Sequence, residues 1–356
     1  MNKNNKNPGT LAEPRNEAKA QDVAEAAGVS RIMVSRAFNP AASIRPDKRD
    51  MILKVAGQLG YHPDMAARSM ATGRSNLVAL LVPSLARAWE SQEVDALIQA
   101  LQTEGLATLV FRLTPEGISS PALRQVRAYK PAAVIAFMDL IAPQDLLPIF
   151  GNSPAIYPHY GEAAPLPTPG APIDRLHINQ HAGIRSGVRL LASAGHRRIA
   201  YVSGASPKSA RPAFNANSDA DRFAALRNAL ESFGLEFAGE IGGEFDYQTA
   251  RQGVVNFVRN GGQADAYFAA NDISAFGAMD ALRFDLDLPV PERCAVIGFD
   301  NVSEAGWRAY DLTTVGIPIQ TRVAALMRLI LARIEEPAGP PRVETVTATL
   351  TVRSSV

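Results

Sequence analysis

From residue 76 onward the sequence alternates short apolar runs with longer amphipathic stretches, and this alternation limits the possible folds more than any other feature. Apolar runs such as LVALLVP, ATLVF and AYFAA are followed by segments of helical period such as EVDALIQALQTEG, PALRQVRAY and SAFGAMDALR. Regular strand–helix alternation predicts βαβ units and parallel sheets. Roughly ten strands would bring one open twisted sheet to its usual upper limit. We therefore expect two Rossmann-like subdomains.

The first part of the chain follows a different plan. Residues 1–17 are polar and rich in Asn, Lys and Pro, so we expect a flexible tail. Three short helices are predicted next, QDVAEAA, RIMVSRAF and PDKRDMILKVAGQL. Gly28 suits the left-handed end of the first helix, Ser30 the N-cap of the second and Pro46 the first turn of the third. Three helices with a tight turn between the first two predict a helix-turn-helix domain over residues 18–62.

The third predicted helix is amphipathic. Met51, Ile52, Val55 and Leu59 recur along it at helical spacing. We expect all four side chains to face the first two helices.

Residues 63–75 are predicted to form a hinge between the helical domain and the α/β part. They contain MAARSMA, a helix so short that it is marginal in water unless DNA or a second copy of the chain holds it. Residues 76–356 are expected to form two subdomains. Their expected ranges are about 76–178 with 310–336 for the N-terminal subdomain and about 179–309 with 337–356 for the C-terminal subdomain.

The formal net charge of +1 conceals an asymmetry. Residues 1–75 contain 5 Lys and 7 Arg against 7 Asp and Glu, a balance of +5. The remaining residues carry 24 basic and 28 acidic side chains, a balance of −4. This division is typical of a basic head that binds a polyanion and a near-neutral body with another role.

Several kinds of site find no support in the sequence. The single cysteine, Cys294, excludes a disulfide scaffold and a zinc site of several thiolates. The motifs GxxxxGKS/T, HExxH and GxSxG are absent, and the five histidines are scattered. We therefore expect no catalytic residue, no metal site and no cofactor.

The sequence also lacks membrane and export signals. No run approaches the roughly 18 apolar residues of a membrane span. The N-terminus, MNKNNKNPGTLAEPRNEAK, has no apolar segment like that of a secretory signal. We expect a cytoplasmic protein without membrane contact.

Seven segments, in order, carry a family resemblance. They are DVAEAAGVS with MVSRAFN, LGYHPDMAARSMATGRS, GHRRIAYVSG, DRFAALRNAL, FAANDISAFGAMDAL, VPERCAVIGFDN and LTTV. Together they resemble the lactose/galactose repressor (LacI/GalR) family, from about Ala20 to Val315. The resemblance implies a helix-turn-helix head on a periplasmic-binding-protein-like core of two Rossmann-like subdomains. It implies a homodimeric transcriptional regulator, most often a repressor, that binds a pseudo-palindromic operator in double-stranded DNA and responds to a small effector between the subdomains.

The resemblance assigns DNA contacts to the second helix. Arg31 and Ile32 occupy the family's base-reading positions, and Arg36 follows one turn later. An arginine can bridge guanine O6 and N7, whereas isoleucine offers apolar contact, for instance to a thymine methyl. Ser30 and Ser35 would contact phosphates. The alternative for both arginines is an ordinary solvated helix face.

Two positions depart from the family pattern. Met33 stands where the family usually has a threonine, so one phosphate contact is expected to be missing. Met70 matches the hinge leucine that family members insert into the minor groove. Because methionine is apolar and flexible, we expect Met70 to insert in the same way.

Five residues match the family's effector-binding positions. Arg222 of DRFAAL would hydrogen-bond the ligand, and Tyr247 of FDYQ would stack on it. Asn271 and Asp300 follow predicted strands, where open α/β sheets bind ligands. Trp89 matches an aromatic after the first strand, with plain packing as its alternative. A sugar, a sugar acid or a nucleoside would suit this set of side chains, and the neighbouring Asp272 is expected to cap a helix.

Two other function classes compete with a regulator. A solute-binding protein would share the α/β body, but it would have a secretory signal and no helical head. An α/β enzyme would need a nucleophile with a base, and the sequence offers no such pair. A gel shift with the upstream promoter DNA separates these classes, because neither alternative binds it specifically.

Overall fold

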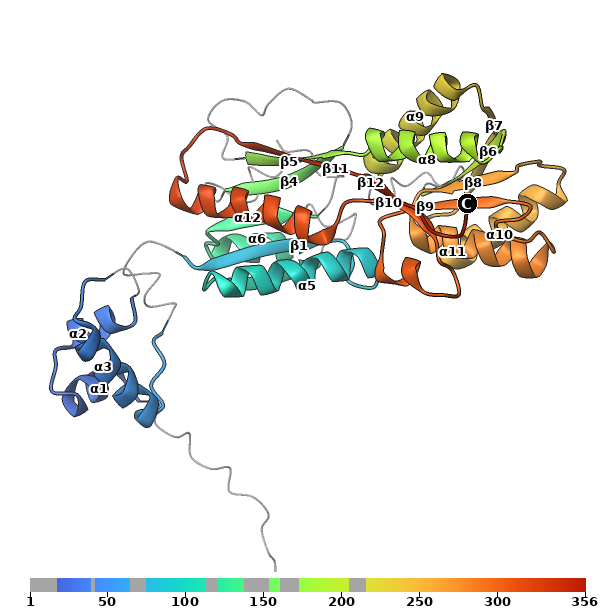
Figure 1. Cartoon of the computed structure of the whole chain (residues 1–356). Coiled ribbons are helices and arrows are strands. Elements are labelled where there is room, and N and C mark those ends of the chain that lie inside the picture. Colours follow the sequence, from blue (N-terminus) through green and yellow to red (C-terminus); the bar gives the residue numbers. More distant parts are fainter. Residues whose placement is uncertain are drawn as a thin grey trace, which may run out of the picture. The chain divides into compact units, whose positions relative to one another are not determined.

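The structure is a computed structural model (Figure 1) that describes residues 18–39, 42–64, 75–112, 121–137, 154–160, 173–204 and 216–356. The chain divides into two compact units, residues 1–75 and 76–356. The predicted tail and most of the predicted hinge, including Met70, lie outside the described residues.

The described residues of the first unit contain three helices, α1 (Ala20–Ala26), α2 (Arg31–Ala37) and α3 (Pro46–Leu59). Gly28 and Gly60, with φ of 62° and 65°, adopt the left-handed conformation that follows α1 and α3. The Ser30 Oγ accepts a hydrogen bond from the Met33 amide at 3.3 Å and caps α2. The predicted helix-turn-helix is confirmed.

The core of the first unit is small, and α3 contributes a different face from the one expected. Ile52 is fully buried and Val55 packs against it, but Met51 and Leu59 are 39% and 42% exposed. The prediction was wrong for these two, and the polar Arg49, one turn before Ile52, contacts α2 instead. Its guanidinium donates hydrogen bonds at 3.0 Å to carbonyl oxygens at the end of α2 and just beyond it.

The second unit contains two six-stranded sheets. In spatial order, the first consists of β11 (Val343–Thr347), β5 (Ile173–Asn179), β4 (Ala155–Tyr160), β3 (Ala133–Ala136), β1 (Leu77–Val82) and β2 (Ala107–Arg112). The second consists of β12 (Thr349–Thr351), β10 (Thr313–Gly316), β9 (Ala295–Phe299), β8 (Ala266–Ala269), β6 (Arg198–Ser203) and β7 (Glu236–Gly242). The described strand pairs are parallel except β10 with β12. Two Rossmann-like subdomains are confirmed.

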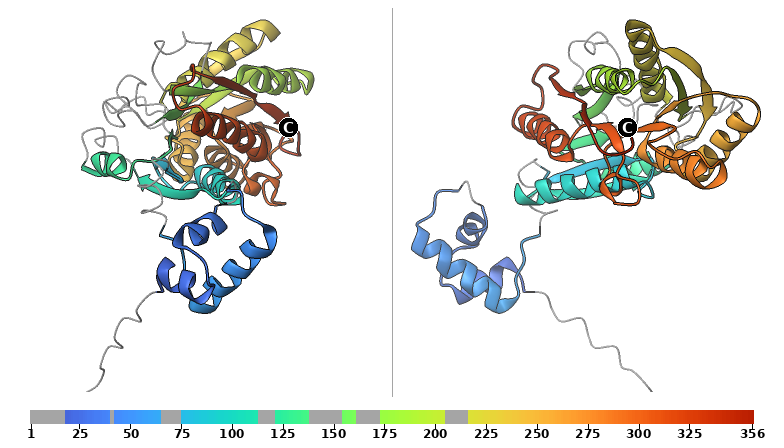
Figure 2. Two further views of the ribbon diagram at one scale, coloured as in Figure 1. Left: turned by 90° about the vertical axis from the view of Figure 1, so that its left-hand side faces the viewer. Right: turned by 45° about the vertical axis from the view of Figure 1, so that its right-hand side comes forward.

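Helices cover the sheets. On the first sheet, α5 (Ala88–Thr103) packs beside α12 (Ile319–Glu335), and α6 (Pro121–Ala128) connects β2 to β3. Figures 1 and 2 show α8 (His181–Ser193) and α9 (Ala216–Phe233) on one side of the second sheet. On its other side lie α10 (Tyr247–Arg259) and α11 (Asp272–Asp280), which continues into a π-helical turn, η2 (Ala281–Asp285). A 3-10 turn, η3 (Ser303–Gly306), follows β9.

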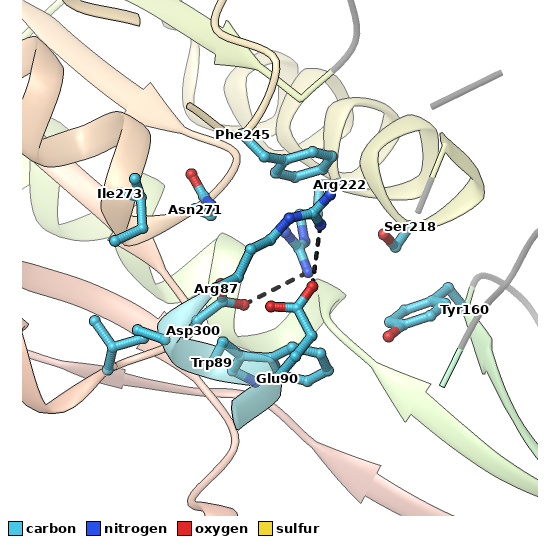
Figure 3. Close-up of a pocket in the computed structure, with 12 residues that line it drawn as sticks. Arg87, Trp89, Glu90, Tyr160, Ser218, Arg222, Phe245, Asn271, Ile273 and Asp300 are labelled. Carbon is cyan, nitrogen blue, oxygen red and sulfur yellow. Dashed lines mark hydrogen bonds and ion pairs between the residues drawn. The ribbon is translucent and has the colours of Figure 1, made fainter. Parts of the chain in front are cut away.

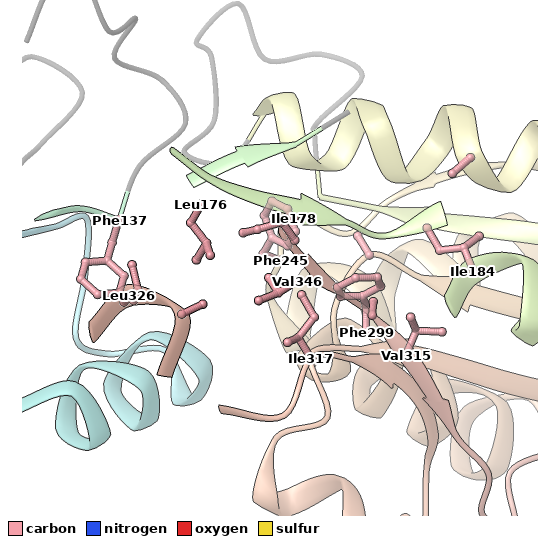
Figure 4. Packing of buried hydrophobic residues seen from close by; sticks show 14 of the residues in the cluster. Phe137, Leu176, Ile178, Ile184, Phe245, Phe299, Val315, Ile317, Leu326 and Val346 are labelled. Carbon is pink, nitrogen blue, oxygen red and sulfur yellow. The ribbon is translucent and has the colours of Figure 1, made fainter. Parts of the chain in front are cut away.

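The largest cluster of buried apolar side chains among the described residues draws on both sheets (Figure 4). Leu176 and Val346 come from the first sheet, and Phe299 and Val315 come from the second. The two subdomains therefore share apolar contacts where the chain crosses between them.

Strand β5 carries charge into the interior, which the apolar pattern did not predict. Asp174 is fully buried and accepts a hydrogen bond from the Nε of Arg333 of α12 at 2.8 Å. A second guanidinium nitrogen of Arg333 also donates to this carboxylate. Because the charge of Asp174 is paired with that of Arg333, the strand tolerates this carboxylate at a buried position.

The expected subdomain ranges need correction at two short segments. β10, expected in the N-terminal subdomain, belongs to the second sheet, and β11, expected in the C-terminal subdomain, belongs to the first. The chain passes between the sheets three times, after β5, after β10 and between β11 and β12. Sequence periodicity reports strands but not the sheet that each strand joins.

Candidate functional site

The exposed face of α2 carries the residues predicted to contact DNA. Ser30, Arg31, Ile32, Ser35 and Arg36 are all exposed in the first unit, and Ile32 is 67% exposed. Among the described residues, neither arginine side chain makes a hydrogen bond or ion pair, and both are exposed. An exposed isoleucine and two exposed arginines on one short helix suit contacts with base edges and phosphates.

Two residues of this helix also have structural roles. The Ser30 Oγ caps α2, and its hydroxyl proton stays available to a phosphate. Met33 packs against the core of the first unit. The departure from threonine at position 33 therefore adds apolar contact inside the domain.

A pocket in the second unit lies at the carboxyl ends of strands from both sheets (Figure 3). This is where ligands bind in open α/β folds. Its lining consists of Arg87, Ala88, Trp89, Glu90, Tyr160, Ser218, Arg222, Phe245, Asn271, Ile273, Asp300 and Val302. Trp89, Arg222, Asn271 and Asp300 from the predicted set are thus brought together.

Arg222 is buried at the back of this pocket, on α9. Its Nε donates a hydrogen bond to the Gln180 Oε1 at 2.7 Å, and its Nη1 donates to the Ala270 carbonyl oxygen. Its Nη2 lies 3.9 Å from the Asp300 Oδ1, and its guanidinium carbon lies 3.7 Å from the centroid of the Phe299 ring. These contacts fix the guanidinium plane before any ligand arrives.

Asp300 follows β9 in an unusual backbone conformation, with φ of 109°. Burial raises the pKa of Asp300 to about 7, although the nearby Arg222 and Arg322 oppose the rise and Glu90 adds to it. The carboxyl group can therefore either accept or donate a hydrogen bond near neutral pH.

Asn271 and Asp272 have different structural roles, one as a helix cap and the other as a buried hydrogen-bond acceptor. The Asn271 Oδ1 accepts a hydrogen bond from the Ser274 amide at 2.9 Å and caps α11. Asp272, which we expected to be the cap, is instead fully buried and accepts hydrogen bonds from the Val302 amide and the Thr314 hydroxyl. It ties the loop after β9 to β10.

Trp89 and Arg87 form the wall contributed by the first subdomain. The Arg322 guanidinium carbon lies 4.8 Å from the Trp89 ring centroid, and the Arg322 Nε donates to the Glu93 Oε1 at 2.7 Å. The Arg87 Nη1 donates to the Glu90 Oε1 at 3.0 Å. Burial raises the pKa of Glu90, against the opposing effect of Arg87.

Family comparisons agree with this geometry. Residues 19–64 match the family described as bacterial regulatory proteins, lacI family, and residues 188–356 match the periplasmic binding protein-like domain. The HTH-type transcriptional regulator CelR of Thermobifida fusca is 27% identical over 329 residues, which is 90% of this chain and 93% of that protein. The HTH-type transcriptional regulator GalS of Salmonella typhimurium is 27% identical over 320 residues, which is 87% of this chain and 88% of that protein. The chain belongs to the LacI family.

Solved structures of LacI-family proteins share the fold. The lac repressor dimer bound to operator and the anti-inducer ONPF has a TM-score of 0.80 at 23% identity, covering 96% of this chain and 99% of that one. The transcriptional regulator CelR in complex with cellobiose has a TM-score of 0.64 at 25% identity, covering 95% and 100%.

LacI-family membership decides between the function classes. The chain is a DNA-binding transcriptional regulator and not an enzyme. The solute-binding alternative accounts for the core, but not for the LacI-type head over residues 19–64.

Tyr247, which was predicted to stack on the effector, is not among the residues that line this pocket. Its hydroxyl donates a hydrogen bond to the Asp280 Oδ2 at 2.6 Å, and burial together with this carboxylate raises its pKa to about 12. Phe245 lines the pocket instead. Glu244 and Phe245, in the turn before Tyr247, have positive φ, 52° and 54°.

The most informative residues that sequence reasoning missed are Arg87 and Glu90. Arg87 is the N-cap of α5 and Glu90 lies in its first turn, after the short loop that follows the carboxyl end of β1. The general position was recognisable, because charged residues that follow a buried parallel strand lie at the ligand-binding edge. Their inward direction depends on how the β1–α5 loop folds.

Other site chemistries find no support in the described part of the chain. No group of three or more His, Cys, Asp or Glu residues there could hold a metal ion. His181 instead contacts the Asp221 Oδ1 at 2.9 Å. No helix within the same residues is long and apolar enough to cross a membrane.

Proposed function

We propose that this regulator is a repressor that binds a pseudo-palindromic operator as a homodimer and responds to a sugar-type effector in the pocket of its core. The observation that carries the proposal is the position of the pocket at strand ends of both sheets. A ligand there contacts both subdomains at once, so it can favour one of their relative orientations.

Relatives support the effector class. Structures of family members hold cellobiose, lactose and ribose. This pocket has arginine, carboxyl and amide groups for hydroxyls, and aromatic rings for the apolar faces of a sugar. A sugar, a sugar acid and a nucleoside all meet these requirements.

The DNA half of the proposal uses residues 18–62 as the reading head and 63–75 as the hinge. Arg31, Ile32 and Arg36 would read bases, Ser30 and Ser35 would contact phosphates, and Met70 would insert into the minor groove. Two-fold symmetry of a dimer would match two half-sites. Such a regulator acts in the cytoplasm, where its operator is.

Control would work as a population shift. Effector binding changes the preferred orientation of the subdomains and thereby the spacing of two paired hinges. Because a helix as short as the predicted hinge is marginal alone, unpaired hinges lose their helical form and their DNA contact. Coupling of about 1–3 kcal/mol would change operator affinity by roughly 5–150-fold.

A double dissociation tests both halves. Arg36→Ala is expected to lower discrimination between the upstream promoter fragment and a scrambled duplex by about 1–3 kcal/mol, while effector binding is retained. Arg222→Ala is expected to retain DNA binding and lose the response to effector. Gel shifts and effector titrations of wild type and both variants measure these outcomes, and melting curves check folding.

Each variant serves as the control for the other. Unchanged discrimination by Arg36→Ala would remove Arg36 from the base-reading set. An effector response of Arg222→Ala equal to that of wild type would refute the pocket assignment. Absence of specific DNA binding by the wild type would refute the regulator role of the head.

A further inference from the structure

We infer that the effector of this pocket carries a carboxylate, as in a sugar acid, and that Arg87 selects it over the corresponding neutral sugar. The inference deepens the proposed function and rests on it.

The pocket contains two guanidinium groups that differ in how many of their hydrogen-bond donors are already used. Arg222 is engaged by Gln180, by the Ala270 carbonyl oxygen and by Asp300. Among the described residues, Arg87 donates one hydrogen bond, from Nη1 to Glu90. A guanidinium has five N–H donors, so the other donors of Arg87 stay available for a ligand. Figure 3 shows both arginines directed into the pocket.

Exposure decides which member of each ion pair a ligand meets. The Arg87 side chain is 31% exposed, whereas that of its partner Glu90 is 3% exposed. The Asp300 side chain is 13% exposed and lies beside Arg222. The polar surface offered by these pairs is therefore dominated by the donors of Arg87.

A donor-rich surface distinguishes a carboxylate from a hydroxyl. Each sugar hydroxyl brings a donor that needs an acceptor, and the acceptors of Glu90 are covered. A carboxylate brings acceptors alone, and the planar fork of an arginine can bind it with two parallel hydrogen bonds. The stacking of Arg87 on Phe245, with 5.8 Å between the guanidinium carbon and the ring centroid, supports its plane from the second subdomain.

The carboxyl groups of the pocket can accommodate the added negative charge. Burial raises the pKa of Glu90 and that of Asp300, the latter to about 7. The charged groups that influence this pair are Arg87 and Glu93 from α5, Arg222 from α9, Arg322 from α12 and Asp272 from α11. An incoming anion favours protonation of Glu90 or Asp300, so binding should take up protons near pH 7 and strengthen as the pH falls.

Calorimetric titration of the full chain with matched pairs tests the inference. The pairs are D-galacturonate with D-galactose and D-glucuronate with D-glucose, and the corresponding sugar 6-phosphates are added for comparison. At least one acid should bind about 10- to 100-fold more tightly than its neutral partner, as expected for a charged hydrogen-bonded pair. Titration in buffers of different ionisation enthalpy should reveal proton uptake for that acid.

Arg87→Gln identifies the selecting residue. It should weaken binding of the preferred acid about 10- to 100-fold and leave the neutral sugar within about threefold. Arg87→Lys keeps the charge but not the planar fork of the guanidinium. Its affinity for the preferred acid should lie between those of Arg87→Gln and wild type. Arg185→Gln, at an exposed arginine on α8 outside this pocket, is the matched control and should behave like wild type. Melting curves and promoter binding verify that each variant is folded.

The outcomes separate this inference from the proposed function. Neutral sugars that bind as tightly as the acids would overturn the inference and leave a sugar effector in place. If the sugar 6-phosphates bound more tightly than the sugar acids, the inference that the effector carries a carboxylate would be overturned. Equal losses for acid and neutral sugar in folded Arg87→Gln would overturn selection by Arg87. If no pair bound at millimolar concentration, both the inference and the sugar class would fall.

Discussion

At the scale of single residues, Asp300 combines requirements of folding with those of binding. Its φ of 109° lies in the region that disfavours most side chains, and Asp and Asn are among those that enter it more readily. Its carboxyl group stands in the pocket at a cost in desolvation that raises the pKa to about 7. The unusual backbone angle and the raised pKa both reduce stability. Such a combination is typical of functional sites.

This raised pKa predicts a specific pH dependence of stability. The folded state keeps the Asp300 proton between about pH 4 and pH 7, where the unfolded chain has released it, so the free energy of unfolding falls as the pH rises through this window. Asp300→Asn should remove this contribution, on the order of 4 kcal/mol, and stabilise the protein above pH 7. Urea denaturation from pH 4 to pH 8 measures the effect.

The control is Asp95→Asn, at an exposed position on α5. It should follow the wild-type curve throughout. If Asp300→Asn had the same pH dependence as wild type, the carboxyl group would not be the one that titrates in this window.

At the scale of secondary-structure elements, sequence patterns succeed where burial and polarity agree. The uniformly apolar β1, β8 and β9 were predicted, and so were the three helices of the head, whose ends are marked by Gly, Ser and Pro. In β5 the buried charges of Asp174 and Arg175 were not predicted, and Asp174 is paired with Arg333, 159 positions away. A pairing at that separation leaves no local signal.

The candidate site divides in the same way. Asn271 and Asp300 could be placed at strand ends, because parallel strands bring their carboxyl ends to one edge. Trp89 and Arg222, which lies within α9, were assigned from the family resemblance. Tyr247 does not line the pocket, and its hydroxyl donates to Asp280 instead; the positive φ angles of Glu244 and Phe245 just before it left no mark in the sequence pattern. These torsions depend on tertiary packing, including the close approach of the Phe245 ring to Gly204.

Where the chain crosses after β5, the start of α8 lies so close to the two other crossings that an added side-chain carbon should destabilise the protein. A Cβ at Gly183 of α8 would lie 2.5 Å from the Val315 Cγ1 and 2.9 Å from the Ala348 carbonyl oxygen, both at the other crossings. Gly183→Ala should therefore cost about 1–3 kcal/mol of stability. Gly57→Ala in α3, where nothing lies within 4 Å, should stabilise the head by about 0.5–1 kcal/mol through helix propensity.

Thermal or urea denaturation compares the two glycine variants. A stability of Gly183→Ala within experimental error of wild type would mean that the three crossings can separate freely. In that case, the crossings would not limit the relative motion of the two subdomains.

At the scale of the whole molecule, the near-neutral chain consists of two parts with different partners. The balance of +5 lies in residues 1–75 and that of −4 in residues 76–356. The excess positive charge of the first part attracts a polyanion. The charges that line the pocket are largely paired within the second part. The two binding reactions of one protein should therefore respond differently to salt.

Operator affinity should fall steeply as the salt concentration rises. Each phosphate neutralised by the head releases condensed counterions, so a plot of log K against log salt has a slope of about −0.9 per contact. Two heads of a dimer should give a slope of several units, and Arg31→Ala should make it shallower if that side chain also contacts phosphate. Binding of a neutral sugar to the same protein should give a slope near zero, because it releases no such ions. Fluorescence anisotropy with a labelled promoter fragment measures the first slope and calorimetry the second; a flat operator slope would contradict a phosphate-binding role for the basic head.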